Sequence, residues 1–312
     1  MALRKILVTG ATGKQGGAVI NALIASPPPY DYEILALTRK ASSPAAQKLA
    51  SNLKVSLIEG DLNDCPAIFK KCPSIWGVFS VQVVQMAQGR GAPKDIEEKQ
   101  GMALIDAAIA SGVSHFVYSS VGSGGLNVEE EEERLNLKVP HFVSKYIVEK
   151  HLKEKAKGTN MTYTILQPVA FIDNFAPGMQ GKAFGAMWTI LNEKKLQVVA
   201  TSDIGRFAAI SFANPEHPDL TNKSITLVGD DLTASEANDV FFKALHRPMP
   251  RTYTFIVSIF MYFFTELGTM SRWFRDIGYK GDVAECKRIN PKMLDLATWL
   301  KEEGQYKSWW ST

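Results

Sequence analysis

Short apolar runs alternate with amphipathic segments along the first half of the chain. The runs are rich in Val, Ile and Leu and are three to six residues long, as expected of short buried strands. The segments between them show helical spacing of apolar residues. The expected strands are Ile6–Val8, Tyr32–Leu37, Val55–Ile58, Gly77–Val81, Phe116–Ser120 and Thr162–Leu166, and the expected helices include 18–24, 44–51, 95–111 and 141–155. This regular alternation predicts an α/β fold with a doubly wound parallel sheet.

The pattern changes after Pro168, where aromatic residues become denser and the alternation loosens. We expect a short strand at 197–199, a helix at 202–213, a strand at 225–228, and a helix from the capping box Thr233–Glu236 to Leu245. Asn290 and Pro291 predict the start of a last helix that ends near Glu302. We therefore predict a first domain at 1–168 and a smaller α+β substrate or partner lobe at 169–312, with the chain crossing back to the first domain around 196–215.

Three glycines at a spacing of three follow the first strand, Gly10, Gly13 and Gly16. A strand, a glycine turn and a helix in this order open the βαβ unit of dinucleotide-binding Rossmann domains. Gly10 permits the tight turn, Gly13 allows backbone amides to approach a pyrophosphate, and Gly16 lets the helix pack on the sheet. The alternative is a glycine-rich turn that binds nothing.

The residues after the second strand bear on the choice of cofactor. Arg39 lies about 20 positions after the glycine triplet, where NAD sites place an acidic residue and NADP sites an arginine. Lys14 and Lys40 add positive charge nearby. We therefore expect NADP(H) to be preferred over NAD(H), unless Arg39 is a solvated surface residue. Asp61 follows the third strand, where a carboxylate accepts from adenine or simply caps the next helix.

Composition excludes several other classes of protein. The formal net charge of +3 gives no reason to expect direct binding of nucleic acid. Three cysteines suit a reducing compartment, and no signal peptide is visible, so we expect a cytoplasmic or nuclear protein. The uncharged stretch Thr252–Thr265 has 14 residues, too few to span a bilayer, and predicts a buried helix or interface rather than a membrane face. The five glutamates at 129–133 predict a solvated loop, and no metal site is expected.

The chain resembles the NmrA-like group of atypical short-chain dehydrogenases/reductases. The resemblance rests on motifs in the family's order: TGATGKQGG (9–17), TR (38–39), GDL (60–62), YSSV (118–121), HFVSKYIVEKHL (141–152), QPVAFIDNF (167–175), SDIG (202–205) and NPKMLDLATWL (290–300). Together they cover most of the chain. The resemblance implies a Rossmann domain that binds NADP(H), with a small C-terminal lobe closing over a cleft.

The same resemblance implies roles for individual residues. The phosphates would be held by Gly10, Thr12, Gly13, Lys14, Gln15 and Gly16, and the 2′-phosphate by Arg39, with Lys40 beside it. Asp61 and Leu62 would contact adenine, and Val81 and Gln82 would lie on the ribose side. Lys145 would reach the nicotinamide ribose, and the segment from Pro168 to Phe171 would lie along the nicotinamide.

The catalytic motif of typical short-chain dehydrogenases is incomplete. Those enzymes use Tyr-x-x-x-Lys, in which the lysine lowers the pKa of the tyrosine. Here His141 stands four positions before Lys145. A histidine can transfer a proton near neutral pH, but the reading we favour is a polar residue at the start of the helix. Val121 stands where a related reductase often has a hydroxyl donor, with Ser119 and Ser120 beside it.

Two functional hypotheses follow. The first is an NADPH-dependent reductase of a small apolar or aromatic substrate, in which Lys145 orients the ribose and donates a proton. Ser120, Val121, Phe171, Phe175 and Trp188 are the candidate substrate contacts, although each of these aromatic residues is also an ordinary core candidate. The second is a non-catalytic NADP(H) redox sensor that acts through a regulatory protein, which the missing tyrosine favours.

Overall fold

The structure is a computed structural model that describes residues 3–82, 95–122, 124, 139–255, 257 and 265–303. The predicted acidic loop at 129–133 and most of the apolar stretch 252–265 lie outside these residues. Within the described part of the chain, no helix is both long and apolar enough to cross a bilayer. The chain forms two compact units, which we describe separately. Unit 1 comprises Met1–Val121, His141–Gln167 and Ile204–Ile225, and unit 2 comprises Gly122–Pro140, Pro168–Asp203 and Thr226–Thr312.

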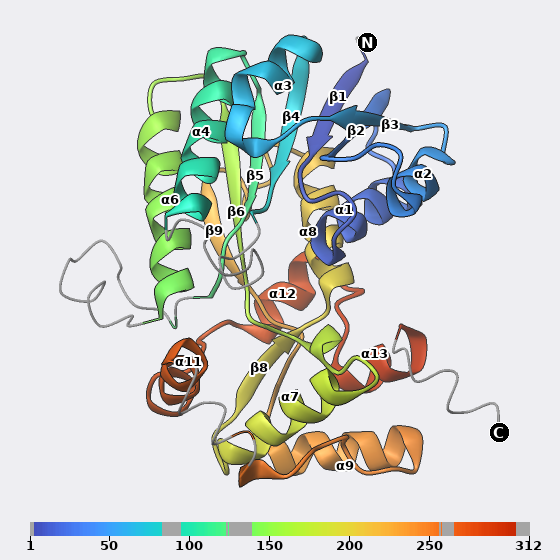
Figure 1. The fold of residues 1–312 in the computed structure, drawn as a ribbon, viewed down its shortest axis with the longest axis vertical. Helices are drawn as coiled ribbons and strands as arrows, with labels where there is room; N and C mark the ends of the chain where they lie inside the picture. The colour runs from blue at the N-terminus through green and yellow to red at the C-terminus, as the bar shows by residue number, and fades with distance from the viewer. Residues whose placement is uncertain are drawn as a thin grey trace. The chain divides into compact units, whose positions relative to one another are not determined.

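Unit 1 is built on a seven-stranded sheet in the order β3-β2-β1-β4-β5-β6-β9 (Figure 1). Neighbouring strands from β3 to β6 pair in parallel. The strands are β1 (Arg4–Val8), β2 (Tyr32–Thr38), β3 (Val55–Glu59), β4 (Ile75–Ser80), β5 (His115–Ser119), β6 (Thr162–Pro168) and β9 (Lys223–Leu227). The predicted α/β fold with a doubly wound parallel sheet is confirmed.

Helices cover both faces of this sheet. They are α1 (Lys14–Ala25), α2 (Pro44–Ala50), α3 (Cys65–Lys71), α4 (Ile96–Ala110), α6 (Pro140–Ala156) and α8 (Thr201–Ala213), with a short 3₁₀ turn η1 (Leu62–Asp64) before α3. One apolar core joins α3, α4 and α6 to the strands through Phe69, Leu104, Phe116, Val148 and Ile165. On the other face, a Cβ at Gly77 of β4 would lie 3.0 Å from the Phe212 ring of α8. Alternate strand residues therefore face two separate helical layers.

Unit 2 contains a small second sheet in the order β10-β8-β7. Its elements are β7 (Ala170–Phe171), η3 (Ile172–Asn174), α7 (Met179–Ile190), β8 (Leu196–Val199), β10 (Asp230–Leu232), α9 (Ala234–Leu245), α11 (Thr265–Asp276), α12 (Val283–Ile289) and α13 (Leu296–Glu302). The predicted capping box is confirmed, because the Thr233 and Glu236 side chains each bond the other's backbone N–H. An aromatic core of Phe175, Phe184, Trp188 and Phe241 packs α7 against α9.

The predicted start of the last helix was wrong. Asn290 terminates α12, and the last helix, α13, begins at Leu296 with the Asp295 side chain accepting a hydrogen bond from Thr298 N at 2.7 Å. The Asn290 side chain instead donates to the buried Asp203 carboxylate at 3.2 Å. Asp203 also accepts from Leu294 N at 2.9 Å, so a tertiary contact occupies the segment that the Asn-Pro signal assigned to a helix.

Candidate functional site

A cavity of about 630 Å³ lies at the carboxyl ends of the unit 1 strands. Its size falls in the range of small-molecule and cofactor sites. Its lining combines the glycine turn after β1, the loop after β2, the η1 turn after β3, the end of β4 and the first turns of α4. The lining residues are Gly10, Thr12, Gly13, Leu37, Thr38, Arg39, Lys40, Gly60, Asp61, Leu62, Asn63, Val81, Ile96 and Gln100.

The glycine turn has the backbone geometry that the sequence predicts. Gly10 has φ +57°, a left-handed conformation, and a Cβ there would lie 2.8 Å from Val81 Cγ1. Gly13 is the N-cap of α1. Since glycine has no side chain, it cannot accept a hydrogen bond from the first backbone N–H groups of the helix. The first N–H groups of a helix have no partner inside it, and they carry a partial positive charge. The turn therefore presents a cradle of the kind that holds a pyrophosphate.

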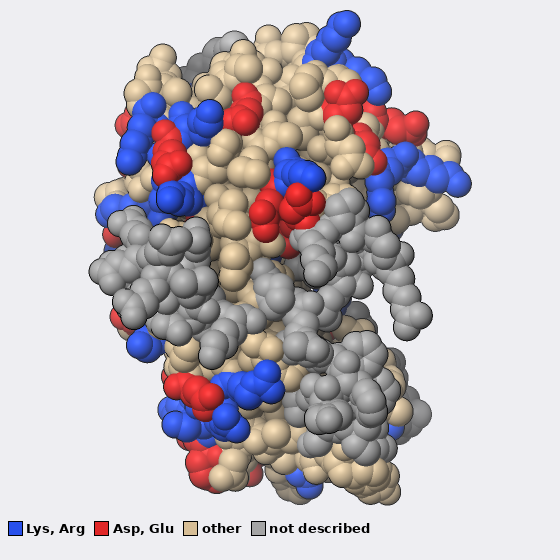
Figure 2. Space-filling model, turned by 60° about the vertical axis from the view of Figure 1, so that its left-hand side comes forward, with Lys and Arg blue, Asp and Glu red and all other residues tan. Residues whose placement is uncertain are grey.

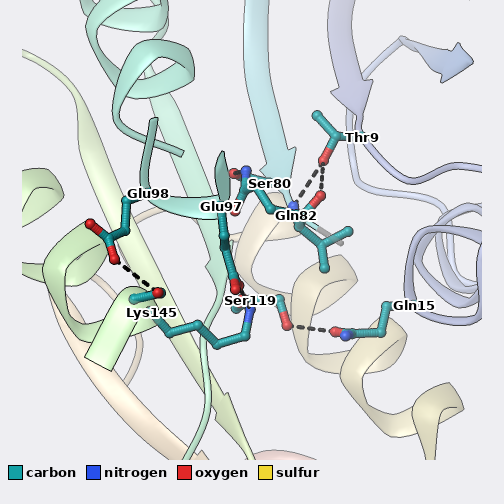
Figure 3. Close-up of polar contacts among 10 residues, drawn as sticks. Thr9, Gln15, Ser80, Gln82, Glu97, Glu98, Ser119 and Lys145 are labelled. Atoms are coloured by element: carbon teal, nitrogen blue, oxygen red, sulfur yellow. Dashed lines mark hydrogen bonds and ion pairs between the residues drawn. The ribbon is translucent and has the colours of Figure 1, made fainter. Parts of the chain in front are cut away.

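The buried Gly16 has a packing role. A Cβ on it would overlap Gly10 O and would lie only 2.7 Å from Thr9 O, so no larger residue fits here without a shift of the backbone. Thr9 in turn fixes the neighbouring strand end, because its Oγ1 donates to Val81 O at 3.0 Å and accepts from Val81 N at 2.8 Å (Figure 3). The helix, the turn and the end of β4 are therefore held in one arrangement around the cavity.

Two cationic side chains lie at the end of the cavity that is formed by the loop after β2. Arg39 and Lys40 are both exposed and both line the cavity. The loop that carries them is fixed by its neighbours, since Ala41 N donates to Glu59 Oε2 at 2.9 Å and Gln47 Nε2 donates to Ala41 O at 2.9 Å. A guanidinium and an ammonium held here favour an anionic group on the ligand.

Asp61 lines the cavity and also caps η1, with its Oδ1 accepting from Asn63 N at 2.8 Å. Both roles considered for this carboxylate are therefore compatible with its position. Beside it, Gln100 Nε2 of α4 donates to Asn63 Oδ1 at 3.0 Å. Leu62 and Ile96 supply apolar surface at the same end of the cavity.

A second group of polar side chains is buried at the ends of β4 and β5, outside the cavity lining (Figure 3). Lys145 of α6 lies with its Nζ 2.8 Å from Glu97 Oε1 of α4 and 3.5 Å from Ser119 O. The Lys145 and Glu97 side chains are only 8% and 3% exposed, respectively. Ser119 Oγ donates to Gln15 Oε1 at 2.5 Å, which links β5 to α1. Gln82 Nε2 donates to Ser80 Oγ at 2.9 Å, while its buried Oε1 has no hydrogen-bond partner in the described chain.

Burial and charge perturb two titratable groups of this region. Burial raises the pKa of Tyr118 well above its usual value, and the nearby Glu97 and Glu149 raise it further. Burial also raises the pKa of Glu149, against the hydrogen bonds that Gln167 Nε2 donates to both carboxylate oxygens at 3.0 and 3.1 Å. The pKa of Tyr118 is therefore shifted in the direction opposite to that of the tyrosine in Tyr-x-x-x-Lys, whose pKa the lysine lowers.

The cavity brings together most of the predicted cofactor residues: Gly10, Thr12, Gly13, Arg39, Lys40, Asp61, Leu62 and Val81. Lys14, Gln15 and Gly16 form the first turn of α1 behind the lining, and Gln82 and Lys145 belong to the buried polar group. Sequence reasoning missed Asn63, Ile96 and Gln100. Ile96 and Gln100 come from a helix remote in the sequence and carry no motif.

The predicted catalytic and substrate residues lie in different surroundings. His141 is half-buried in the first turn of α6, with its ring edge-on to Phe142 at 4.6 Å. Ser120 and Val121 directly follow β5, and Ser120 N donates to Leu166 O at 2.8 Å. Pro168 and Phe171 begin the second segment of unit 2. Phe175 and Trp188 are fully buried in the aromatic core of that unit, as expected for core residues, so we assign them no substrate contact.

Among the described residues, no group of three or more metal-ligating side chains is close enough to hold an ion. The site comprises the glycine turn and the cations Arg39 and Lys40, which line the cavity, and the buried Lys145, which lies outside its lining. Together with the doubly wound sheet, these features are those of a nucleotide-binding Rossmann domain.

Comparison with known proteins identifies the family. A model described as the NmrA-like family matches residues 3–309, and the chain belongs to that family. An NmrA-like family domain-containing oxidoreductase of Aspergillus hancockii is 29% identical over 173 residues, which cover 55% of this chain and 48% of the relative. The matches span about half the length of the first curated relatives, 48%, 51% and 50%.

Solved structures of related proteins share the fold. The triphenylmethane reductase of Citrobacter sp., complexed with NADP(H), has a TM-score of 0.69 at 18% identity, over 96% of this chain and 99% of that one. NmrA, a negative transcriptional regulator, was solved in complex with NAD, with a TM-score of 0.67 at 15% identity over 96% of this chain and 94% of that one. At these identities the structural likeness concerns the fold alone.

Proposed function

We propose that this chain binds NADP(H) in the unit 1 cavity and acts as an NADPH-dependent reductase of a small apolar or aromatic substrate. One observation carries the proposal: the glycine turn at the start of α1 and the cations Arg39 and Lys40 line the same cavity. A dinucleotide phosphate has anionic groups at its pyrophosphate and at its adenosine 2′ position. The cavity offers a complementary group at each place.

The order of strands supports an orientation for the ligand. The adenosine end would lie over β2 and β3, with the 2′-phosphate on Arg39 and Lys40 and the adenine between Leu62 and Ile96, near Asp61. The pyrophosphate would lie at Gly10, Thr12 and Gly13, after β1. Since β4 and β5 follow β1 in the sheet, the nicotinamide end would point past Val81 toward Ser119.

NADPH, when bound, supplies the hydride, and the protein contributes orientation and a proton. Lys145 is the residue proposed to orient the nicotinamide ribose and to donate a proton. Its ammonium carries three N–H bonds, and the contacts to Glu97 and Ser119 O involve two of them at most. Ser120 and Val121 are the proposed substrate contacts in unit 1, while Pro168 and Phe171 remain proposed neighbours of the nicotinamide.

Cofactor binding is tested by titrating the purified chain with NADPH and NADH and following ligand fluorescence. We expect Arg39→Ala to raise the Kd for NADPH by about 10- to 100-fold, the loss typical of a hydrogen-bonded charge contact, and to change the Kd for NADH by less than about threefold. Lys48→Ala is the matched control, because it removes an exposed positive charge from α2, outside the cavity lining. Equal losses of NADPH and NADH binding in Arg39→Ala would contradict the 2′-phosphate role.

The second candidate function is a non-catalytic NADP(H) sensor that acts through a regulatory protein. His141 in place of the tyrosine and the pairing of Lys145 with Glu97 favour it. The two functions are separated by following NADPH oxidation against a panel of ketones, enones and imines. Turnover that Lys145→Ala abolishes supports the reductase. Tight NADPH binding without turnover of any compound in the panel supports the sensor.

A further inference from the structure

We propose that Glu97 is the positioning residue for Lys145, and that it sets the ammonium in place for the nicotinamide ribose. The inference rests on the proposed NADP(H) function and assigns a role to a residue that carries no motif. Glu97 lies in the first turn of α4, one position after Ile96 and three before Gln100, and both of these neighbours line the cavity. The helix that closes the adenosine end of the cavity therefore also holds the lysine.

The contact between Glu97 and Lys145 is short and buried. Their charged atoms are 2.8 Å apart, and neither side chain is more than 8% exposed. A lysine has four rotatable side-chain bonds, so an ammonium reaching from α6 needs a fixed partner to keep a single position. Ser119 O lies 3.5 Å from Nζ and is a weak partner at that distance. The carboxylate is therefore the group that fixes Nζ.

The helices α4 and α6 that carry the pair are in close contact along their length. The sequence neighbours of the pair also contact each other: Ser144 Oγ of α6, next to Lys145, donates to Glu98 Oε1 of α4, next to Glu97, at 2.9 Å (Figure 3). One helical turn further along, the helices approach so closely that a Cβ at Gly101 would lie 2.8 Å from both methyl groups of Val148. The half-buried His151 of α6 and the exposed Asp106 of α4 follow, with Nε2 and Oδ1 2.8 Å apart. Contacts along the whole interface fix the two helices that carry Glu97 and Lys145.

The strand register places Nζ beyond the described cavity. Ser80 of β4 pairs with Tyr118 of β5, so Val81, which directly follows β4, is next in register to Ser119, the last residue of β5. Val81 is a cavity residue, and Ser119 O is the backbone atom near Lys145 Nζ. A ligand that extends from the glycine turn past Val81 would therefore reach the lysine with its second ribose.

The alternative is that the pair serves only the packing of α4 on α6. Buried ion pairs are weak evidence for stability, so burial alone does not decide between the roles. The two roles differ in which ligand they affect. A positioning residue for the nicotinamide ribose acts on NADPH, but leaves unchanged a ligand that ends at the first phosphate.

The test compares NADPH with adenosine 2′,5′-bisphosphate, which carries the adenine and the 2′-phosphate but no nicotinamide ribose. We expect Glu97→Gln to raise the Kd for NADPH by about tenfold or more, as for loss of a charged contact, and to leave the Kd for the bisphosphate within about twofold. Glu98→Gln is the matched control. It removes the adjacent negative charge but keeps an amide oxygen that can accept from Ser144 Oγ, so the contact between the helices is retained and both ligands should bind to it as to the wild type.

A double variant tests whether Glu97 acts through the lysine. Adding Glu97→Gln to Lys145→Met should cause no further loss of NADPH binding. The double variant leaves neither charge buried without its partner. It therefore keeps the test valid even if Glu97→Gln alone fails to fold. Unchanged NADPH binding in Glu97→Gln, equal losses for both ligands, or multiplying losses in the double variant would each overturn the positioning role. A wild-type chain that binds neither ligand would instead overturn the proposed function itself.

Discussion

The Ser119 hydroxyl donates a hydrogen bond to Gln15 Oε1 at 2.5 Å and so joins β5 to the first turn of α1. The two residues are far apart in the sequence, and Ser119 is fully buried. The Gln15 side chain, which the family resemblance assigned to the phosphates, is therefore directed to the neighbouring strand end. Its proposed contribution to cofactor binding is to fix the helix that carries the phosphate-binding amides.

This contact predicts coupled effects on stability. Gln15→Leu should lower the free energy of unfolding by about 1–3 kcal/mol, because it leaves the buried Ser119 hydroxyl without its acceptor. Ser119→Ala should cost about 1 kcal/mol. The double variant should cost less than the sum of the two, with a coupling of about 1 kcal/mol in chemical denaturation. Additive losses would show that the contact contributes nothing.

The neighbouring glycines Gly16 and Gly17 should respond to alanine in opposite directions. A Cβ at Gly16 would overlap the backbone oxygens of Gly10 and Thr9, whereas one at Gly17 would lie 3.5 Å from Ala11 O, an ordinary contact. Gly16→Ala should therefore lower the free energy of unfolding by about 2 kcal/mol or more. Gly17→Ala should raise it by up to about 1 kcal/mol, since alanine is the better helix former. Denaturation without ligand measures both, and equal effects would contradict the packing role of Gly16.

His115 predicts a loss of stability in acid. Its ring is buried, with Nδ1 2.8 Å from Thr162 Oγ1 and Nε2 2.7 Å from Ser211 Oγ. Burial lowers the pKa of His115 from 6.5 to about 3. The unfolded chain therefore binds a proton below pH 6.5 that the folded chain does not. The contribution of His115 to stability is complete above that pH and falls between about 6.5 and 3, by up to about 1.4 kcal/mol per pH unit.

The measurement is the free energy of unfolding at several pH values for the wild type and for His115→Gln. The variant is expected to be less stable at neutral pH, because it fills the site less well. The relevant quantity is the difference in slope below pH 6.5, which isolates His115 from the carboxylates that titrate in the same range. Parallel pH profiles for the two proteins would contradict a neutral buried imidazole.

Local signals predicted the strands and most helices of unit 1, because buried parallel strands are apolar runs and the helices between them have amphipathic spacing. The short helix Cys65–Lys71 was missed, although Asp64 caps it and Pro66 lies in its first turn. The start of the last helix was wrong because Asn290 and Asp295 are both good N-caps, and only the contact of Asn290 with Asp203 decides between them.

The candidate site likewise contains some residues that the sequence predicted and others that it did not. Its glycine turn, Arg39 and Asp61 directly follow strands, so the topology of a parallel sheet alone places them at one edge. Gln100 and Glu97 reach the site from a helix that begins after β4, and nothing in their local sequence separates them from solvated polar residues. In particular, the doublet Glu97–Glu98 resembles an ordinary acidic helix start, and its pairing with Ser144 and Lys145 appears only once α4 and α6 are packed.

The last strand of the large sheet, β9, and most of α8 come from a segment that lies between the second and third segments of unit 2 in the chain. No single cut in the polypeptide therefore separates the two units. During synthesis, the nucleotide-binding half cannot complete its sheet until residue 227 has left the ribosome, by which time part of the other half has already emerged. A truncated chain that ends at residue 168 would expose β6 as an unpaired edge and would be prone to aggregate.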